Sequence, residues 1–284
     1  MPRHTPPRPQ PWRQQVDGGV AEIVPDNNRP YAAELYVNGA PQSHVDLAEP
    51  DYLCYEYVQH ITDVLDVAFP PRAPVDVLHL GGGALTLPRY LAASRPRSRQ
   101  RVVEVDAQLV TLVRNALPLP PRHGITVSTG DARQALDRVR PASYDAIVVD
   151  VFAGPLMPAS LASREAFGEL AEALRPGGTL VVNLADGKAL TFARALVATA
   201  RDVLAPLRVV VDAQVWRGRR FGNLVLIASG CPDLDQPLRR RLAGGPFPAR
   251  LIDDPELARF AADATVMTDA TAVGSPLPPA DTFS

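Results

Sequence analysis

The sequence predicts an α/β fold, namely an open, mostly parallel seven-stranded sheet with helices on both faces, preceded by a small antiparallel β unit. From about residue 75 to residue 229, short runs that are apolar throughout alternate with segments of helical periodicity. Strands of this kind are buried on both faces, which is typical of parallel sheets covered by helices. Ahead of them, the dipeptide Asn38-Gly39 is a strong hairpin signal between two β-like runs.

Composition and charge narrow the function classes. Of the 284 residues, 46% are apolar and 21% charged, which is ordinary for a soluble protein with a substantial core. The formal net charge of -2 favours neither nucleic acid nor a membrane surface as a partner. No apolar run approaches the ~20 residues that a membrane span needs, and the N-terminus lacks the apolar stretch of a secretory signal. Because Cys54 and Cys231 are too few for a disulfide framework, we expect a cytoplasmic protein.

The first 70 residues divide into a tail and a small folded unit. Residues 1–17 are rich in Pro, Arg and Gln and lack hydrophobic periodicity, so we expect them to be disordered. Residues 18–70 are expected to form a β-hairpin unit followed by a helix near 52–67.

The main domain is predicted for residues 71–232, and a C-terminal extension for residues 233–284. The expected strands of the sheet are residues 75–80, 101–105, 125–128, 144–150, 179–184, 207–211 and 224–228. The helical patterns between them are residues 84–95, 107–117, 132–139, 161–174 and 187–204. In the extension we expect a short helix at 254–262 and a loose tail from Gly274.

Four successive strand ends carry features that suit a nucleotide. In open α/β sheets, ligands bind beyond the carboxyl ends of the strands. There the sequence places the turn Gly81-Gly82-Gly83, then Glu104 about 20 residues later, then Asp131, and finally Asp150. Each feature alone also suits an ordinary turn or helix cap, but together they favour a nucleotide site. The isolated His79 is expected to be a packed residue, and no Cys or His cluster has the spacing of metal ligands.

These motifs resemble those of the spermidine synthase family, a Rossmann-like branch of the class I S-adenosylmethionine-dependent methyltransferase fold. The resemblance runs from about Tyr36 to Ser229. In the main domain, Gly81-Gly82-Gly83 matches the family's Gly-Gly-Gly-Asp-Gly-Gly, and Glu104-Val105-Asp106 matches its Glu-Ile-Asp. Gly130-Asp131-Ala132 matches Gly-Asp-Gly/Ala, and Asp150 matches the first acid of Asp-Ser/Thr-Ser/Thr-Asp-Pro. Nearer the N-terminus, Asn38-Gly39-Ala40-Pro41-Gln42 matches the hairpin with its nucleoside-contacting Gln, and Asp51-Tyr52-Leu53-Cys54-Tyr55-Glu56 matches Asp-Glu-Phe-x-Tyr-His/Gln.

The resemblance implies that an amine attacks a carbon bonded to a sulfonium. An amine with a pKa near ~10 is mostly protonated at neutral pH, so the reaction needs a proton acceptor. By resemblance, Asp150 is that acceptor and Tyr55 helps to orient it. The implied nucleoside ligands are Gln42, Gly81, Gly82, Gly83, Glu104, Asp131 and Ala132. The implied co-substrate is S-adenosylmethionine or its decarboxylated form, without a metal, and the implied assembly is a homodimer.

Two departures from the family pattern leave the reaction open. Ala84 replaces the acid of the glycine loop, and Ala153 replaces the second acid of the motif that begins at Asp150. In the family both acids help to hold cationic amines, and a charge-assisted hydrogen bond contributes about 1.5–3 kcal/mol. Aminopropyl transfer to an amine is therefore ranked first, methyl transfer to a less cationic acceptor second, and nucleoside binding without catalysis third.

Overall fold

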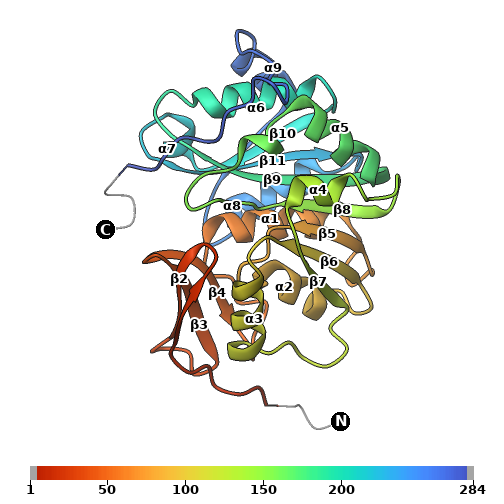
Figure 1. Ribbon diagram of the computed structural model, residues 1–284. Coiled ribbons are helices and arrows are strands. Elements are labelled where there is room, and N and C mark those ends of the chain that lie inside the picture. The colour runs from red at the N-terminus through yellow and green to blue at the C-terminus, as the bar shows by residue number, and fades with distance from the viewer. Residues whose placement is uncertain (1–4, 280–284) are drawn as a thin grey trace.

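The structure, a computed structural model, describes residues 5–279 and contains two β-sheets (Figure 1). The smaller, antiparallel sheet has the order β1-β2-β3-β4. Its strands are β1 (Trp12–Val16), β2 (Gly19–Pro25), β3 (Ala32–Val37) and β4 (Ala40–Asp46). The expected hairpin at Asn38-Gly39 is confirmed, with both residues at positive φ. The Asn38 side chain also accepts a hydrogen bond from the Val20 amide and donates one to the Gly18 carbonyl, which ties the two hairpins together.

The prediction of disorder up to residue 17 is wrong for β1. Trp12–Val16 pairs with β2 in an antiparallel register, and the side chain of Val16 is buried. The local sequence is polar because only one side of this edge strand meets the core, while its backbone is stabilised by the ladder. Residues 1–4 lie outside the described part of the chain.

The larger sheet has eight strands in the order β12-β10-β11-β9-β8-β5-β6-β7. Its strands are β5 (Asp76–Leu80), β6 (Arg99–Glu104), β7 (Ile125–Thr129), β8 (Tyr144–Val149), β9 (Leu174–Asp186), β10 (Leu207–Val211), β11 (Gly222–Ser229) and β12 (Arg250–Ile252). Strands β5 to β9 run parallel, and β10 to β12 pair antiparallel. The seven expected strands are confirmed, but the count is corrected to eight, because the short β12 extends the edge formed by β10.

Helices cover both faces of the large sheet. They are α1 (Glu56–Ala68), α2 (Thr86–Ser94), α3 (Ala107–Ala116), α4 (Ala132–Leu136), α5 (Arg164–Ala173), α6 (Thr191–Arg201), α7 (Ala213–Trp216), α8 (Asp235–Gly244) and α9 (Asp254–Phe260), with a 3-10 turn at Ala159–Leu161. Neighbouring residues on a strand point to opposite faces, so Val77 packs with α1, α2 and α8, whereas Leu78 packs with α4, α5, α6 and α9. Helix α8 was not expected from the sequence. Between residues 5 and 279, no helix is long and apolar enough to cross a membrane.

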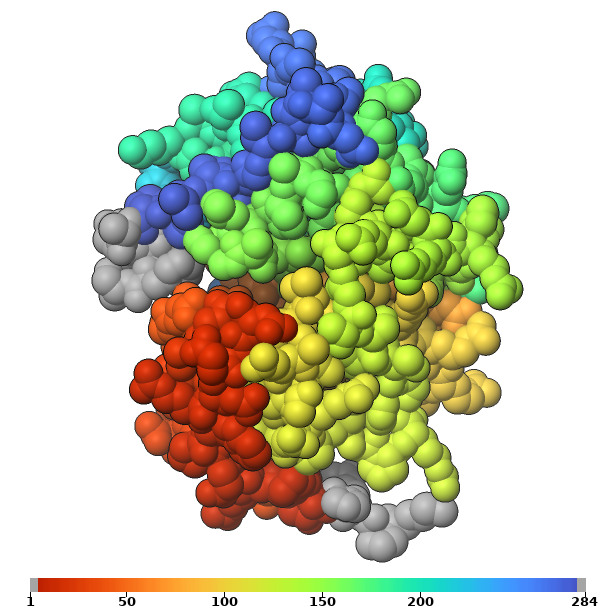
Figure 2. Space-filling model, viewed as in Figure 1, coloured from red at the N-terminus to blue at the C-terminus, as the bar shows by residue number. Residues whose placement is uncertain are grey.

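The small sheet packs against one end of the large one. A shared apolar cluster joins Val16, Ile23 and Leu35 of the small sheet to Leu109 and Leu112 of α3. Figure 2 shows these N-terminal strands (red) directly against the α3 region (yellow). Helix α1 instead packs on the large sheet, although the sequence grouped it with the β-hairpin unit. The packing of the small sheet on α3 places β4 next to the glycine turn that follows β5.

The C-terminal segment is more ordered than expected. Ser275 is buried, donates its backbone N–H to the Met157 carbonyl at 3.1 Å, and accepts from the Met157 amide at 2.9 Å. The prediction of a loose tail from Gly274 is therefore wrong at its start, because this segment straps the loop that follows β8. Residues 280–284 lie outside the described range.

Candidate active site at the carboxyl ends of β5 and β8

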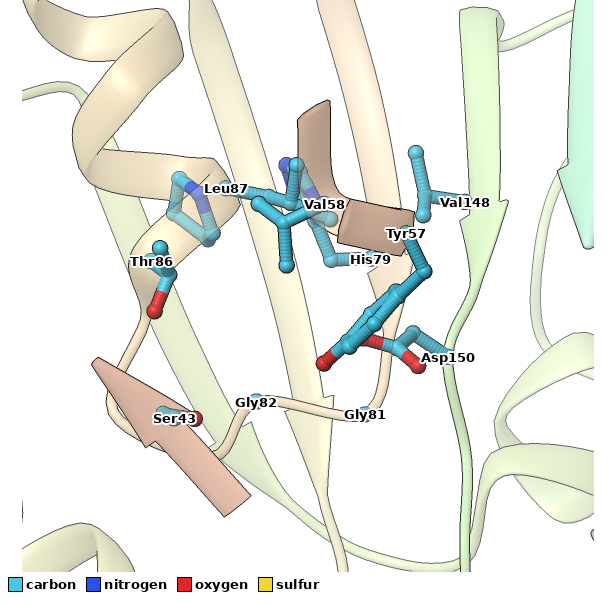
Figure 3. Close-up of a pocket in the computed structure, with 11 residues that line it drawn as sticks. Ser43, Tyr57, Val58, His79, Gly81, Gly82, Thr86, Leu87, Val148 and Asp150 are labelled. Atoms are coloured by element: carbon cyan, nitrogen blue, oxygen red, sulfur yellow. The ribbon is translucent and has the colours of Figure 1, made fainter. Parts of the chain in front are cut away.

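A cavity that is open to solvent lies where β5 and β8 end (Figure 3). Its walls come from β4, α1, α2 and the two strand ends. The lining residues are Ser43, Tyr57, Val58, His79, Gly81, Gly82, Thr86, Leu87, Pro88, Val148 and Asp150. Of the residues chosen from the sequence, Gly81, Gly82 and Asp150 line this cavity. The site therefore lies at the sheet edge where the sequence predicts it.

The glycine turn lies directly against the backbone of Asp150. Gly81 has φ +92°, and a Cβ on it would lie 2.0 Å from the Asp150 carbonyl oxygen. The Asp150 amide donates to the Leu80 carbonyl at 2.9 Å. Only glycine fits at position 81. The close contact between the two backbones fixes the position of the Asp150 Cα relative to the glycine turn.

Ser43 of β4 holds the other end of the turn. Its Oγ accepts from the Ala84 amide at 3.2 Å, and a Cβ on Gly83 would lie 2.7 Å from the same oxygen. The Ala84 side chain is fully buried in the apolar cluster between the two sheets and does not line the cavity. In this structure, position 84 is thus part of the core.

Glu104 is hydrogen-bonded to the glycine turn. Its Oε2 accepts from the amides of Gly82 at 2.8 Å and Gly83 at 3.2 Å, and its Oε1 accepts from the Asp106 amide at 3.2 Å. The carboxylate therefore stabilises the turn and lies beside Gly82, at the junction between the main cavity and a smaller apolar one near α3.

Within residues 5–279, Asp150 is the only carboxylate that lines the cavity. It is partly buried, and its Oδ1 accepts from Asn183 Nδ2 at 2.8 Å. The Tyr57 hydroxyl is a second donor that faces this carboxylate and lowers its pKa, and Figure 3 shows the Tyr57 ring reaching from α1 toward Asp150. Two donors thus orient one carboxylate at the bottom of the cavity.

Burial controls the titration of both partners. Loss of solvation raises the pKa of Asp150 to about 6, and the nearby negative charge of Glu104 adds to this rise, while the hydrogen bonds from Asn183 and Tyr57 oppose it. Burial also raises the pKa of Tyr57 well above its usual value. At neutral pH, Asp150 is therefore ionised and Tyr57 is a neutral donor.

Tyr55 lies beside Tyr57 but does not contact Asp150. The two rings stack with their centroids 6.4 Å apart, and the buried Tyr55 hydroxyl has no hydrogen-bond partner among the described residues. Burial raises the pKa of Tyr55, and the charge of Glu34 on β3 adds to the rise. The catalytic role assigned to Tyr55 stays a prediction, while the contact with Asp150 comes from Tyr57.

The remaining predicted nucleoside ligands lie around the cavity and outside its lining. Asp131 is exposed beyond the end of β7, where its Oδ1 caps α4 by accepting from the Gln134 amide at 2.9 Å. Ala132 is buried in the first turn of that helix. Gln42 precedes Ser43 on β4 and donates only to the Ala40 carbonyl, at 3.4 Å. The structure places these residues at the same end of the sheet without bringing them into one cavity.

His79 is a packed residue that also lines the cavity. Gln100 donates to the Pro88 carbonyl through Nε2 and therefore turns its Oε1 toward His79 Nε2, 3.0 Å away. Burial lowers the pKa of His79 to about 4, so its imidazole is neutral at physiological pH. Among residues 5–279, no group of three or more His, Cys, Asp or Glu side chains is arranged to hold a metal ion.

Sequence reasoning missed three polar residues of this site: Tyr57, Asn183 and Asn223. Tyr57 lies in the helix expected near 52–67, and the helical pattern does not mark it as facing a carboxylate. Asn183 did carry a signal, because it interrupts the apolar run Leu180-Val181-Val182 on the strand next to that of Asp150. A buried amide in such a run needs a polar partner, and here the partner is the carboxylate.

Comparisons with known proteins point in one direction. The chain is 31% identical to a probable spermidine synthase from Corynebacterium glutamicum, whose crystal structure matches it with a TM-score of 0.85 over 93% of this chain and 97% of the other. It is 33% identical over 117 residues to a polyamine aminopropyltransferase from Vibrio vulnificus, a match that covers 40% of this chain and 39% of that protein. The chain thus matches less than half the length of this curated relative.

The fold is shared more widely. Human methyltransferase-like protein 13, in complex with SAH, matches 76% of this chain and 96% of its own with a TM-score of 0.54 at 19% identity, which shows likeness of fold alone. No protein-family model matches the chain.

Proposed function

Because the chain belongs to the spermidine synthase family, we propose that it transfers an aminopropyl group from decarboxylated S-adenosylmethionine to an amine, with Asp150 as the proton acceptor. The acceptor ammonium gives one proton to the carboxylate, and the amine nitrogen then attacks the propyl carbon bonded to the sulfonium. A C–N bond forms as the C–S bond breaks. The sulfur keeps the bonding electrons, leaving a neutral thioether nucleoside and an aminopropylated amine.

The environment of Asp150 carries this proposal. A general base works best when it is ionised but not fully solvated. The pKa of Asp150 is raised to about 6 by burial, and two hydrogen-bond donors, Asn183 and Tyr57, hold the carboxylate in one orientation. The base is therefore charged at neutral pH and preorganised toward the cavity.

The charge of the cavity supports a cationic substrate. With His79 neutral, Asp150 is the only ionised residue at neutral pH among the described residues that line the cavity. None of these described side chains offers a positive charge to the amino-acid carboxylate of intact S-adenosylmethionine. A decarboxylated donor and an amine acceptor both lack such a carboxylate and suit this negative field.

A fit for the nucleoside rests on the turn and on Glu104. Gly81 and Gly82 line the cavity, and the Glu104 carboxylate lies beside Gly82, where its Oε2 accepts from the Gly82 amide at 2.8 Å. Gln42, Gly83, Asp131 and Ala132 are proposed to complete the nucleoside site.

Methyl transfer from intact S-adenosylmethionine is the second candidate, favoured by one observation. Ala153, where the family has an acid, is exposed in the loop after Asp150, so this loop lacks that acid for a second ammonium. A homodimeric assembly and a cytoplasmic location stay predictions.

One experiment separates these functions. The purified chain is offered intact or decarboxylated S-adenosylmethionine, each with diamines and triamines, and the products are identified by mass spectrometry. We expect methylthioadenosine and an aminopropylated amine from the decarboxylated donor only. A methylated product from intact S-adenosylmethionine would instead support methyl transfer.

A further inference from the structure

Two asparagine side chains form a hydrogen-bonded chain that ends at Asp150. Asn223 Nδ2 donates to Asn183 Oδ1 at 2.9 Å, and Asn183 Nδ2 donates to Asp150 Oδ1 at 2.8 Å. The three residues come from β11, β9 and the end of β8, which are adjacent in the sheet. This hydrogen-bonded chain reaches Asp150 from β9 and β11, on one side of β8, whereas the glycine turn follows β5, on the other side of β8.

Strand register brings the three side chains together. Val149 of β8 lies opposite Val182 of β9, so the next residues along each strand, Asp150 and Asn183, are neighbours. Asn223 pairs with Ala185 on β9, two residues from Asn183, which places the two asparagines in a diagonal pair on one face.

The direction of the Asn183 amide matters for Asp150. Asn183 is 1% exposed, so both ends of its amide need partners within the protein. An amide can present either an oxygen or an N–H group, and only the N–H group stabilises a carboxylate. The donor from Asn223 occupies the Asn183 oxygen and thereby selects the orientation with N–H toward Asp150.

We propose that Asn223 is a positioning residue that acts through Asn183: it fixes the direction of the Asn183 amide and so keeps the Asp150 carboxylate ionised and in one orientation. The catalytic consequence rests on the proposed function, whereas the amide orientation does not. The other polar groups that face Asp150 are the Tyr57 phenol from α1, the Glu104 carboxylate from the end of β6 and, in the same cavity, the neutral His79.

The test compares four variants with the unaltered chain. Asn223→Leu removes the first donor, Asn183→Leu removes the second, and a third variant combines both. Thr179→Val is the matched control, because it removes a buried side-chain hydrogen bond to Ser229, 2.8 Å long, between the same two strands but away from Asp150. Asn223 is only partly buried, so Asn223→Leu keeps the test informative even where Asn183→Leu fails to fold.

The first readout is the pKa of Asp150 itself, followed by ¹³C NMR of protein labelled at its aspartates. The resonance is assigned by its loss in Asp150→Asn. We expect Asn223→Leu to raise this pKa by about half a unit to one unit and Asn183→Leu to raise it further. In the Asn183→Leu background, Asn223→Leu should not change the pKa of Asp150 further, because Asn223 acts on Asp150 only through the Asn183 amide.

The second readout is turnover of the amine and the decarboxylated donor. We expect Asn223→Leu to lower kcat at pH 7 about 3- to 10-fold, to leave KM unchanged and to move the acidic limb of the pH profile upward.

The two measurements distinguish failure of the positioning role of Asn223 from failure of the proposed aminopropyl transfer. A pKa of Asp150 in Asn223→Leu that equals that of Thr179→Val overturns the inference, and so does an equal shift in both backgrounds. If the pKa shifts as expected while the unaltered chain transfers no aminopropyl group, the positioning role stands and the proposed function fails.

Discussion

The Tyr57 hydroxyl, in the first turn of α1, faces the Asp150 carboxylate at the end of β8 and holds the pKa of that carboxyl below the value that burial alone would give it. The contact stabilises the ionised carboxylate and adds a second donor to the one from Asn183. It also distinguishes two neighbouring tyrosines that the sequence alone does not separate.

Replacing Tyr57 by Phe should reduce transfer more than replacing Tyr55 by Phe. Tyr57→Phe removes a donor to Asp150, so we expect kcat/KM at pH 7 to fall about tenfold, the free-energy equivalent of one hydrogen bond to a charged group. Tyr55→Phe removes a hydroxyl without a partner among the described residues, and we expect less than a twofold change. Steady-state kinetics of both variants tests this order. A larger loss for Tyr55→Phe would restore Tyr55 as the residue that orients the base.

The activity should require a deprotonated group with a pKa near 6. Asp150 accepts a proton only when ionised, and its pKa is raised to about 6. We therefore expect log kcat/KM to fall with unit slope as the pH drops below about 6. The measurement is a pH profile at constant ionic strength. An acidic limb near pH 4 would mean that the base is solvated and not buried as the structure has it.

Asp150→Asn should stabilise the folded chain at neutral and higher pH. The folded-state pKa lies above the ordinary value of 3.8, so the folded state binds more protons than the unfolded state between these two values. Stability contributed by the protonated carboxyl is then lost as the pH rises through about 6. We expect the variant to have the higher Tm at pH 8 and the difference to vanish below pH 4. Melting curves that stay parallel from pH 4 to pH 8 would contradict this account.

An acid introduced at position 84 should destabilise the fold, whereas an acid at position 153 should strengthen binding of a diamine. Ala84 is fully buried among apolar side chains, so Ala84→Asp is expected to destabilise the fold by about 2–4 kcal/mol. Ala153 is exposed in the loop that follows Asp150, so Ala153→Asp should fold normally and, as the second acid of the family motif, lower the KM for a diamine. Urea unfolding and acceptor titrations check these outcomes. If Ala84→Asp is as stable as the unaltered chain, position 84 is not part of the core.

The strands of the large sheet and the place of the site could be predicted from local patterns, because apolar strands and the glycine turn are formed by consecutive residues. The partners of Asp150 could not. Tyr57, Asn183 and Asn223 come from three other elements, and only the register of β8, β9 and β11 brings the two asparagines into line with the carboxylate. Strand β1 was missed for a related reason, since its polar residues are stabilised by the ladder to β2 and not by their own pattern.

The affinity of the site for the nucleoside should depend on Glu104 and not on Asp150. Glu104→Ala removes the acceptor that holds the amides of Gly82 and Gly83, so we expect nucleoside affinity to fall at least tenfold, measured by calorimetry with methylthioadenosine. An unchanged affinity would show that the nucleoside depends neither on the Glu104 carboxylate nor on the turn that it holds.

The most direct test of the central role of Asp150 is to measure binding and turnover of Asp150→Asn side by side. The carboxamide keeps the shape of the residue but accepts no proton at neutral pH. The account predicts that methylthioadenosine, the uncharged nucleoside, binds with an affinity within about twofold of the unaltered chain, while transfer to the amine falls by two orders of magnitude or more. Transfer at an undiminished rate, or a loss of nucleoside affinity as large as that of Glu104→Ala, would contradict it.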